Sequence, residues 1–256
     1  MKKYLLGAAA ALAIAAPGVA SAQGYVDLGY TSGEVDFGGP SADFDGWQLG
    51  GAAAFGGNGT VGFQIDGLVG NLEGDGGGDV DTYSFGGHAF TRNSSHLIGG
   101  FVNYGGADAG GGADYDYWTI GVEGQLYLSR TTLDGSVSYS EADDLDGELT
   151  AIDLGATHFL TDNFSFGGGF GFANLEVPGG DVDATNFGLN AEYQFASLPI
   201  SIFGGYSHLE VDDIDLDSDA VSVGVRYNFG GSLFERNRSG PSLSRSVGFG
   251  RFGGLL

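Results

Sequence analysis

The chain has 256 residues, with 33 acidic residues against 9 lysines and arginines, and it contains no cysteine. So negative a chain lacks the basic surface by which proteins bind nucleic acid, and without cysteine it has no disulfides to stabilise it. Glycine is abundant, at 51 residues, but 13% of the residues are aromatic and apolar residues recur regularly, which argues against disorder.

The first 22 residues have the composition of a cleaved export signal. Lys2 and Lys3 form a basic start, residues 4–16 are apolar, and residues 20–22 (ASA) supply the small side chains of a cleavage site. The apolar stretch is too short for a transmembrane anchor, and no later segment reaches the roughly 18 apolar residues of a membrane-spanning helix. We therefore expect cleavage before Gln23 and export of the remaining chain.

Beyond residue 22, apolar and polar side chains alternate with period two, which is typical of β-strands. In residues 184–195, for example, Leu189 and Tyr193 share one face, while Asn190 and Glu192 share the other. Turn-forming residues divide the pattern into about 12 strands, with about 10 or 14 as open alternatives. The candidate strands lie near residues 24–31, 45–55, 60–70, 82–91, 97–105, 115–128, 131–140, 149–160, 164–175, 184–195, 200–209 and 220–229.

The connections between these strands alternate in length and charge. One set is short and has tight-turn compositions, as in residues 129–130 (SR) and 161–163 (TDN). The other set is longer and, counted with two residues on either side, holds 25 of the 33 acidic residues. The longer segments are residues 32–44, 71–81, 106–114, 141–148, 176–183 and 210–219. Acidic residues are therefore concentrated at one end of the predicted sheet.

A membrane barrel explains this pattern better than a soluble sandwich. Strands of about 9–11 residues suit a tilted crossing of the bilayer, whereas sandwich strands usually have about five or six residues. The polar faces are rich in small uncharged side chains, and residues 23–256 contain no lysine, which suits a lumen. Because backbone in lipid must be fully hydrogen-bonded, the sheet must close. We predict an all-β, antiparallel, up-and-down transmembrane barrel over residues 23–229.

Aromatic residues fall near both ends of the predicted strands, as expected for two interfacial girdles. Those near the acidic connections are Tyr30, Trp47, Tyr83, Tyr104, Trp118, Tyr139, Phe172 and Tyr206. Those near the short turns are Phe55, Phe90, Phe159, Phe164, Phe195 and Phe229. Residues 97–105 are ambiguous, because Leu97, Ile98, Phe101 and Val102 place apolar side chains on both faces.

Three segments resemble the porin-like family of outer-membrane β-barrels found in Gram-negative proteobacteria. They are residues 20–23 (ASAQ), residues 158–164 (HFLTDNF), which are similar to a periplasmic turn of that family, and residues 221–229 (VSVGVRYNF), which are similar to its C-terminal β-signal. The resemblance implies a place in the cell outer membrane, among lipid and lipopolysaccharide. It also implies that the barrel-assembly machinery recognises the strand from Val221 to Phe229.

The chain departs from that family by continuing past Phe229. Residues 230–256 are rich in serine and glycine and carry Arg236, Arg238, Arg245 and Arg251 against Glu235 alone. We expect a flexible periplasmic tail. A plug inside the acidic lumen is the alternative.

The function that this architecture favours is a porin-like channel for passive diffusion of small polar solutes or ions. About 12 strands enclose a narrow lumen, whereas about eight are filled by side chains. The residues expected to line the pore are Asp27, Asp66, Glu123, Asp134, Asp153, Glu192 and Arg226. An excess of acid favours cations, so weak cation selectivity is expected. The alternative for each residue is a structural role, as a cross-link within the wall. The solute and the oligomeric state stay open.

A second interpretation is a structural or interaction barrel whose acidic loops bind divalent cations loosely. Asp213, Asp215, Asp217 and Asp219 offer the oxygen ligands that Ca²⁺ or Mg²⁺ prefers. Their spacing does not fit an EF-hand loop, which has glycine and glutamate at fixed positions, so they are weak candidates. No firmly bound metal or cofactor is expected.

A third interpretation, an outer-membrane hydrolase, needs a positioned base, which is usually histidine. The candidates are His88, His96, His158 and His208, of which only His208 lies among several carboxylates in the sequence. No catalytic motif accompanies it, so we do not expect an enzyme.

Overall fold

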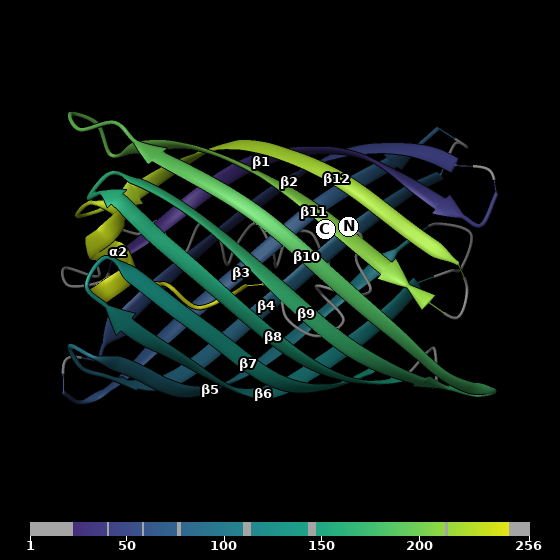
Figure 1. Ribbon diagram of the computed structural model, residues 1–256, viewed down its shortest axis with the longest axis horizontal. Helices are drawn as coiled ribbons and strands as arrows, with labels where there is room; N and C mark the ends of the chain where they lie inside the picture. The colour runs from purple at the N-terminus through teal and green to yellow at the C-terminus, as the bar shows by residue number, and fades with distance from the viewer. Residues whose placement is uncertain are drawn as a thin grey trace.

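The computed structural model describes residues 23–39, 41–57, 59–75, 78–109, 114–142, 147–212 and 215–245. Twelve strands close into a single barrel, in which each strand is antiparallel to its neighbours and β1 pairs with β12 (Figure 1). The predicted fold class and strand number are confirmed. The predicted export signal lies outside the described residues.

The strands are longer than the sequence pattern indicates. They are β1 (Gln23–Phe37), β2 (Ser41–Gly56), β3 (Val61–Gly74), β4 (Gly78–Arg92), β5 (His96–Asp108), β6 (Asp114–Leu128), β7 (Thr131–Ala142), β8 (Gly147–Thr161), β9 (Phe164–Val177), β10 (Gly180–Gln194), β11 (Ile200–Val211) and β12 (Leu216–Phe229). Most of the extra residues belong to segments predicted as acidic loops. There the hydrogen-bond ladder continues, pairing Glu34 with Asp219 for example, because polar residues in water can extend a strand as long as a neighbour pairs with it.

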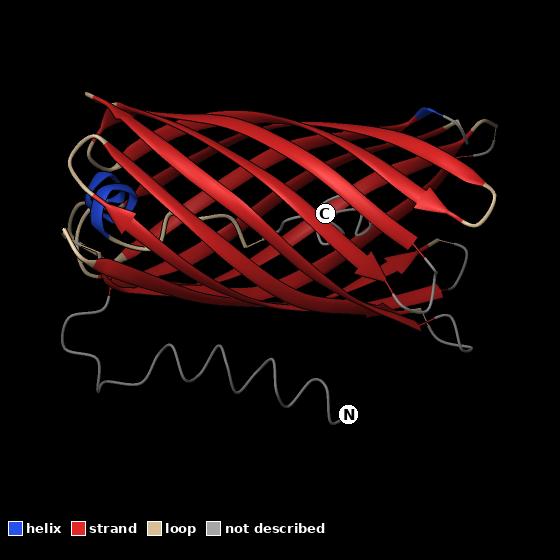
Figure 2. Cartoon of the chain, turned by 90° about the horizontal axis from the view of Figure 1, so that it is seen from below, coloured by secondary structure: helices blue, strands red, loops and turns tan. Residues whose placement is uncertain are grey.

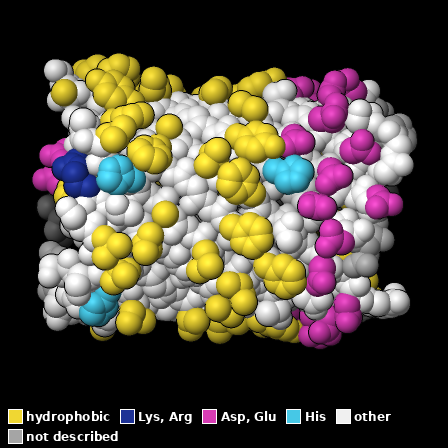
Figure 3. All heavy atoms as spheres, in the orientation of Figure 1, with side chains coloured by type: hydrophobic (Ala, Val, Ile, Leu, Met, Phe, Trp, Pro, Cys, Tyr) yellow, Lys and Arg dark blue, Asp and Glu magenta, His cyan; other side chains and the backbone are white. Residues whose placement is uncertain are grey.

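Side chains in the middle of the strands alternate as predicted. Val223 and Val225 of β12 and Ile120 of β6 lie exposed on the outer face, whereas Thr119 and Ser201 are buried on the inner face. Figure 3 shows hydrophobic side chains over the middle of the visible outer surface and carboxylates gathered at one end. We call that end the acidic end and the opposite one, which carries α2 in Figure 1, the short-turn end.

At the acidic end the polarity of the two faces is reversed. On the inner face, Leu149 and Leu209 belong to one buried apolar cluster, and Phe44 and Leu72 belong to another. On the outer face, carboxylates replace the apolar side chains, as at Asp45, the exposed neighbour of Phe44 on β2. The reversal marks the level at which the strands leave an apolar environment and their outer face meets water.

The predicted girdle is correct only in part. Tyr30, Trp47 and Tyr104 are exposed on the outer face at the boundary with the acidic end. Phe90 and Phe159, which we assigned to the other girdle, are instead 2% exposed and face the lumen. They lie on the inward parity of β4 and β8, where they pack against the C-terminal part of the chain.

The C-terminal extension also differs from the expected flexible tail. In its described part, α2 (Leu233–Ser239) begins with a capping box formed by Ser232 and Glu235, each accepting a hydrogen bond from the other's backbone amide. Figure 2 shows α2 within the outline of the barrel and the chain after it running inside. The serine- and glycine-rich composition of residues 230–256 suggested flexibility, because it gives no sign of the side chains in the lumen that bind this segment. We call residues 232–245 the luminal segment.

Among the described residues, no helix is long and apolar enough to cross a membrane.

Candidate functional site

The structure places all seven predicted pore-lining residues on the inner face of the barrel. Five of the acids are buried, with exposures of 2% to 9%, and Asp134 is the one acid that is exposed. The buried acids are Asp27, Asp66, Glu123, Asp153 and Glu192. Their inward position agrees with the predicted parity, while their part in conduction stays a prediction.

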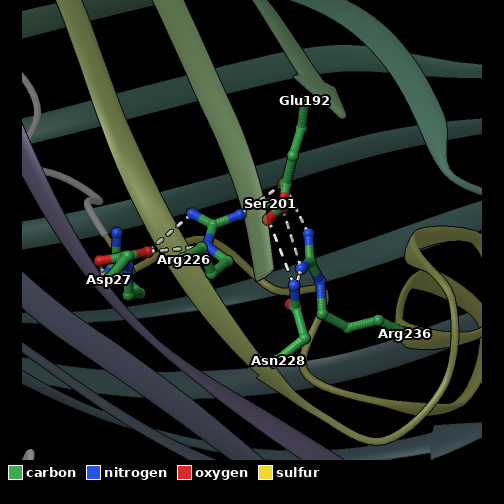
Figure 4. A network of polar contacts seen from close by, with 7 residues as sticks. Asp27, Glu192, Ser201, Arg226, Asn228 and Arg236 are labelled. Atoms are coloured by element: carbon green, nitrogen blue, oxygen red, sulfur yellow. Dashed lines mark hydrogen bonds and ion pairs between the residues drawn. The ribbon is translucent and has the colours of Figure 1, made fainter. Parts of the chain in front are cut away.

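Asp27, Arg226 and Glu192 form a continuous ion-pair network across three strands of the wall (Figure 4). Arg226 donates from Nε and Nη2 to Oδ2 of Asp27, at 2.9 and 2.7 Å, and from Nη1 to Oε2 of Glu192, at 2.5 Å. Ser201 donates to the other oxygen of Glu192 at 2.5 Å. The Arg226 guanidinium also lies 4.3 Å from the centre of the Tyr25 ring, a cation–π contact.

Two arginines of the luminal segment complete this network. Arg236 donates to both carboxylate oxygens of Glu192, at 3.1 and 2.7 Å, and to the side-chain oxygen of Asn228. Arg245 donates to Oδ1 of Asp27 at 2.9 Å. Each acid is therefore shared between the wall arginine and one arginine that arrives from the end of the chain.

A second buried network joins β3, β4 and β6. The His88 ring lies between two carboxylates, with Nε2 2.9 Å from Asp66 and Nδ1 2.8 Å from Glu123. Gln64 donates to Asp66 at 3.0 Å. Four of the predicted pore acids thus belong to cross-links within the wall, which is the structural alternative considered for each of them.

Asp134 and Asp153 lie on the inner faces of β7 and β8. They line a cavity of about 130 Å³ on the inner wall, together with Glu123 and Ser242 of the luminal segment. Ser136 donates to Asp153 at 3.4 Å. This cavity is where acidic side chains of β6, β7 and β8 meet space inside the barrel.

Among the described residues, the weak metal candidates do not form a group of their own. Asp213 lies outside the described residues, and Asp219 accepts hydrogen bonds from Tyr206 and contacts His208 at 3.1 Å. Asp217 instead lies with His208 and Glu210, and ligand atoms of these three residues are within 4.8 Å of one another. All three are on the outer face of β11 and β12, partly or fully exposed to solvent.

The other histidines serve local structure. His96 is the first residue of β5, and its ring nitrogens contact Asn93 and Ser95 of the preceding turn. His158 contacts the Thr131 hydroxyl at 2.9 Å.

Sequence reasoning missed the roles of Arg236 and Arg245. Two signals pointed to them. A basic extension follows an acidic barrel, and residues 97–105 are apolar on both faces. Leu97 and Phe101 face inward with exposures of 0% and 3%, and Leu97 packs in the cluster that includes Leu243 of the luminal segment.

Comparison with known proteins identifies a family and a set of similar barrels. A family model described as Gram-negative porin matches residues 25–233. None of the curated proteins matches the chain. The COG4313 outer membrane channel from Pseudomonas putida F1 has a TM-score of 0.63 at 10% identity, covering 81% of this chain and 95% of that one.

Two further solved structures share the barrel fold. The translocator domain of the autotransporter NalP from Neisseria meningitidis has a TM-score of 0.56 at 14% identity, covering 89% of this chain and 95% of that one. The KdgM porin in complex with disordered oligogalacturonate has a TM-score of 0.53 at 10% identity, covering 80% of this chain and 99% of that one. At these identities the likeness shows the fold alone.

Proposed function

The chain belongs to the Gram-negative porin family, and on that premise we propose that it is a passive outer-membrane channel for small polar solutes or ions, with weak cation selectivity. The observation that carries the proposal is the closed barrel with apolar side chains outside and polar side chains inside over its middle. By the rule for such barrels, the short-turn end faces the periplasm and the acidic end faces the outside.

Charge supports a weak preference for cations rather than a strong one. Carboxylates surround the acidic end, so cations concentrate there. Further inside, Asp27 and Glu192 are paired with three arginines, and His88, when it is protonated, offsets one of the two charges of Asp66 and Glu123. Asp134 and Asp153 line the cavity at β7 and β8. A mouth rich in acid and a nearly balanced interior together give modest selectivity.

Recordings in planar lipid bilayers test this function. The purified, refolded barrel is expected to give discrete conductance steps, and a KCl gradient is expected to give a reversal potential with the sign of cation preference. A clear preference for chloride, or a folded barrel without steps, would count against the proposal. A heat-modifiable band on a gel establishes folding in the same sample.

The carboxylates on the outer face favour a second candidate role, a barrel that binds divalent cations at the level of the lipid headgroups. All six arginines of the described residues lie in the short-turn half, so none of them pairs with the carboxylates of the acidic end. His208, Glu210 and Asp217 are the best placed to share an ion. Calorimetry with Ca²⁺ tests this role, and no heat at millimolar cation would remove it.

A further inference from the structure

The luminal segment is fixed to the inner wall by contacts from several strands. Ser242 makes three hydrogen bonds to the wall. Its hydroxyl accepts from Arg92 at 3.0 Å and donates to Gln125 at 2.9 Å, and its carbonyl accepts from the Gln125 side-chain amide at 2.9 Å. The next residue, Leu243, exchanges backbone hydrogen bonds with the side-chain amide of Gln64, at 3.1 and 3.2 Å. Side chains of β3 and β6 therefore hydrogen-bond to the backbone of this segment, and Arg92 of β4 bonds to the Ser242 hydroxyl.

Apolar contacts hold the segment at two levels. Leu243 is buried in a cluster with Phe90, Leu97 and Tyr127 of the wall. Nearer the short-turn end, Phe234 of α2 meets Phe159 edge to face, with ring centres 5.2 Å apart. These wall side chains are the inward-facing apolar residues that a purely aqueous lumen would not require.

The wall also leaves space for the segment. Gly50 of β2 has no side chain, and a Cβ atom there would clash with Nη1 of Arg245. Glycine at this position therefore leaves room for the guanidinium where it bonds to Asp27.

The segment reverses the charge of the constriction that it enters. The wall alone supplies two carboxylates, on Asp27 and Glu192, and one guanidinium, on Arg226, which gives a formal charge of −1. With Arg236 and Arg245 in place the same cluster has three guanidiniums and a formal charge of +1. In a narrow, low-dielectric passage such a change acts directly on which ions pass.

We propose that the luminal segment is a resident plug, and that Arg236 and Arg245 are the residues through which it sets the conductance and ion selectivity of the channel. The inference rests on the proposed channel function. The plug narrows the short-turn half and masks the two wall acids, so that a barrel with an acidic mouth conducts with only weak cation preference.

The first experiment compares three chain lengths in planar bilayers. A chain ending at Phe229 loses the plug, and a chain ending at Arg245 keeps the whole luminal segment and is the matched control. The shorter chain is expected to conduct roughly twofold or more above the full chain, with a K⁺ over Cl⁻ permeability ratio raised by a similar factor. The control is expected to match the full chain. Equal conductance in all three folded proteins would overturn the plug.

The second experiment separates charge from bulk in the full-length chain. The double variant Arg236→Gln and Arg245→Gln keeps the segment and its apolar contacts but exposes Asp27 and Glu192. We expect the permeability ratio to rise while conductance changes little. Arg238→Gln is the matched control, because Arg238 donates to the carbonyls of Ser129 and Thr131 in a short turn and not to the network. An unchanged ratio in the double variant would overturn the role of these arginines.

The third experiment tests residence. Since the chain has no cysteine, Gln125→Cys with Ser242→Cys provides a single pair of thiols, one on β6 and one on the segment. The Ser242 hydroxyl contacts the far end of the Gln125 side chain, and cysteine is shorter than glutamine, so the thiols are joined with a short bis-thiol cross-linker rather than by a direct disulfide. A resident plug predicts equal conductance before and after cross-linking. A fall on cross-linking would mean that the segment leaves the lumen in the conducting state, which contradicts residence.

The outcomes also separate the plug from the channel function. If the full chain conducts and the chain ending at Phe229 conducts identically, the channel stands and the plug fails. If only the shortened chain conducts, the plug stands and passive conduction by the full chain fails. If no folded variant conducts, both fail.

Discussion

The two ends of this barrel handle charge in opposite ways. At the acidic end the charges lie outside, and the inner face is apolar, with Phe44 and Leu72 among its buried side chains. In the short-turn half the buried charges lie inside and are paired, as in the contacts of Asp27 and Glu192 with arginine. Water solvates an exposed carboxylate without help, whereas a buried one needs a partner. Cations are therefore required only where the acids turn inward.

The largest expected effect comes from removing a shared partner of two buried acids. Replacing His88 by alanine leaves Asp66 and Glu123 facing each other without it. The free energy of unfolding is expected to fall by about 3–5 kcal/mol, measured by urea titration in lipid vesicles. The same change at His208 is the control from the acidic end, where an exposed pair with Asp219 contributes about 1 kcal/mol or less. Similar losses at both sites would break the comparison.

A charge on the outer face tests where the lipid begins. Val223, in the middle of β12, is 57% exposed in the isolated chain. Val223→Arg is expected to destabilise the folded barrel by about 2–4 kcal/mol, because arginine then lies near the bilayer midplane. Asp217→Arg, on the same face and strand but at the acidic end, is expected to cost about 1 kcal/mol or less. Equal costs would show that the polarity reversal does not mark the edge of the membrane.

Arg226→Gln tests the shared network at the short-turn end. Hydrogen bonds to charged groups contribute about 1.5–3 kcal/mol, and we expect a stability loss near the lower value because Asp27 and Glu192 each keep one arginine of the luminal segment. For the same reason, cation selectivity is expected to rise less than in the Arg236/Arg245 double variant. A larger rise would place the control of selectivity in the wall instead.

The smallest expected effect concerns the start of α2. Ser232→Ala removes the capping side chain and is expected to weaken the helix by about 1 kcal/mol. Hydrogen exchange should then show faster exchange confined to the amides of α2, with protection of the strands unchanged. Slower or unaltered exchange in α2 would contradict a role for the cap.

The barrel was largely predictable from the sequence, because a lipid-facing strand must place apolar side chains at every second position. That rule also gave the inward direction of the seven pore residues. It did not give the ends of the strands: Glu34 and Asp36 look like loop residues, yet they remain paired in β1. The alternation of apolar and polar residues reflects lipid on one face of a strand and water on the other. Where both faces of the strand leave the lipid, the alternation ends, and the end of the strand can no longer be read from the sequence.

The site itself was predictable only in part. The alternation of residues assigned Asp27, Glu192 and Arg226 to the lumen. It could not show that Arg236 and Arg245, which lie more than 200 residues after Asp27 in the sequence, pair with the same two acids. Long-range pairing leaves no period in the sequence. Two signals remained in the composition: basic residues after an acidic barrel, and apolar side chains on both faces of residues 97–105.

The capped helix and its arginines also have a consequence for how the molecule is put together. Asp27 and Arg226 face each other on the first and last strands, the seam where the barrel closes. The luminal segment bonds to both sides of that seam, since Ser239 contacts Gln23 of β1 and Arg236 contacts Asn228 of β12. These contacts stabilise the closed seam from the inside of the barrel. Sideways opening of the barrel between β1 and β12 would therefore have to break the hydrogen bonds that hold the luminal segment to one of the two strands.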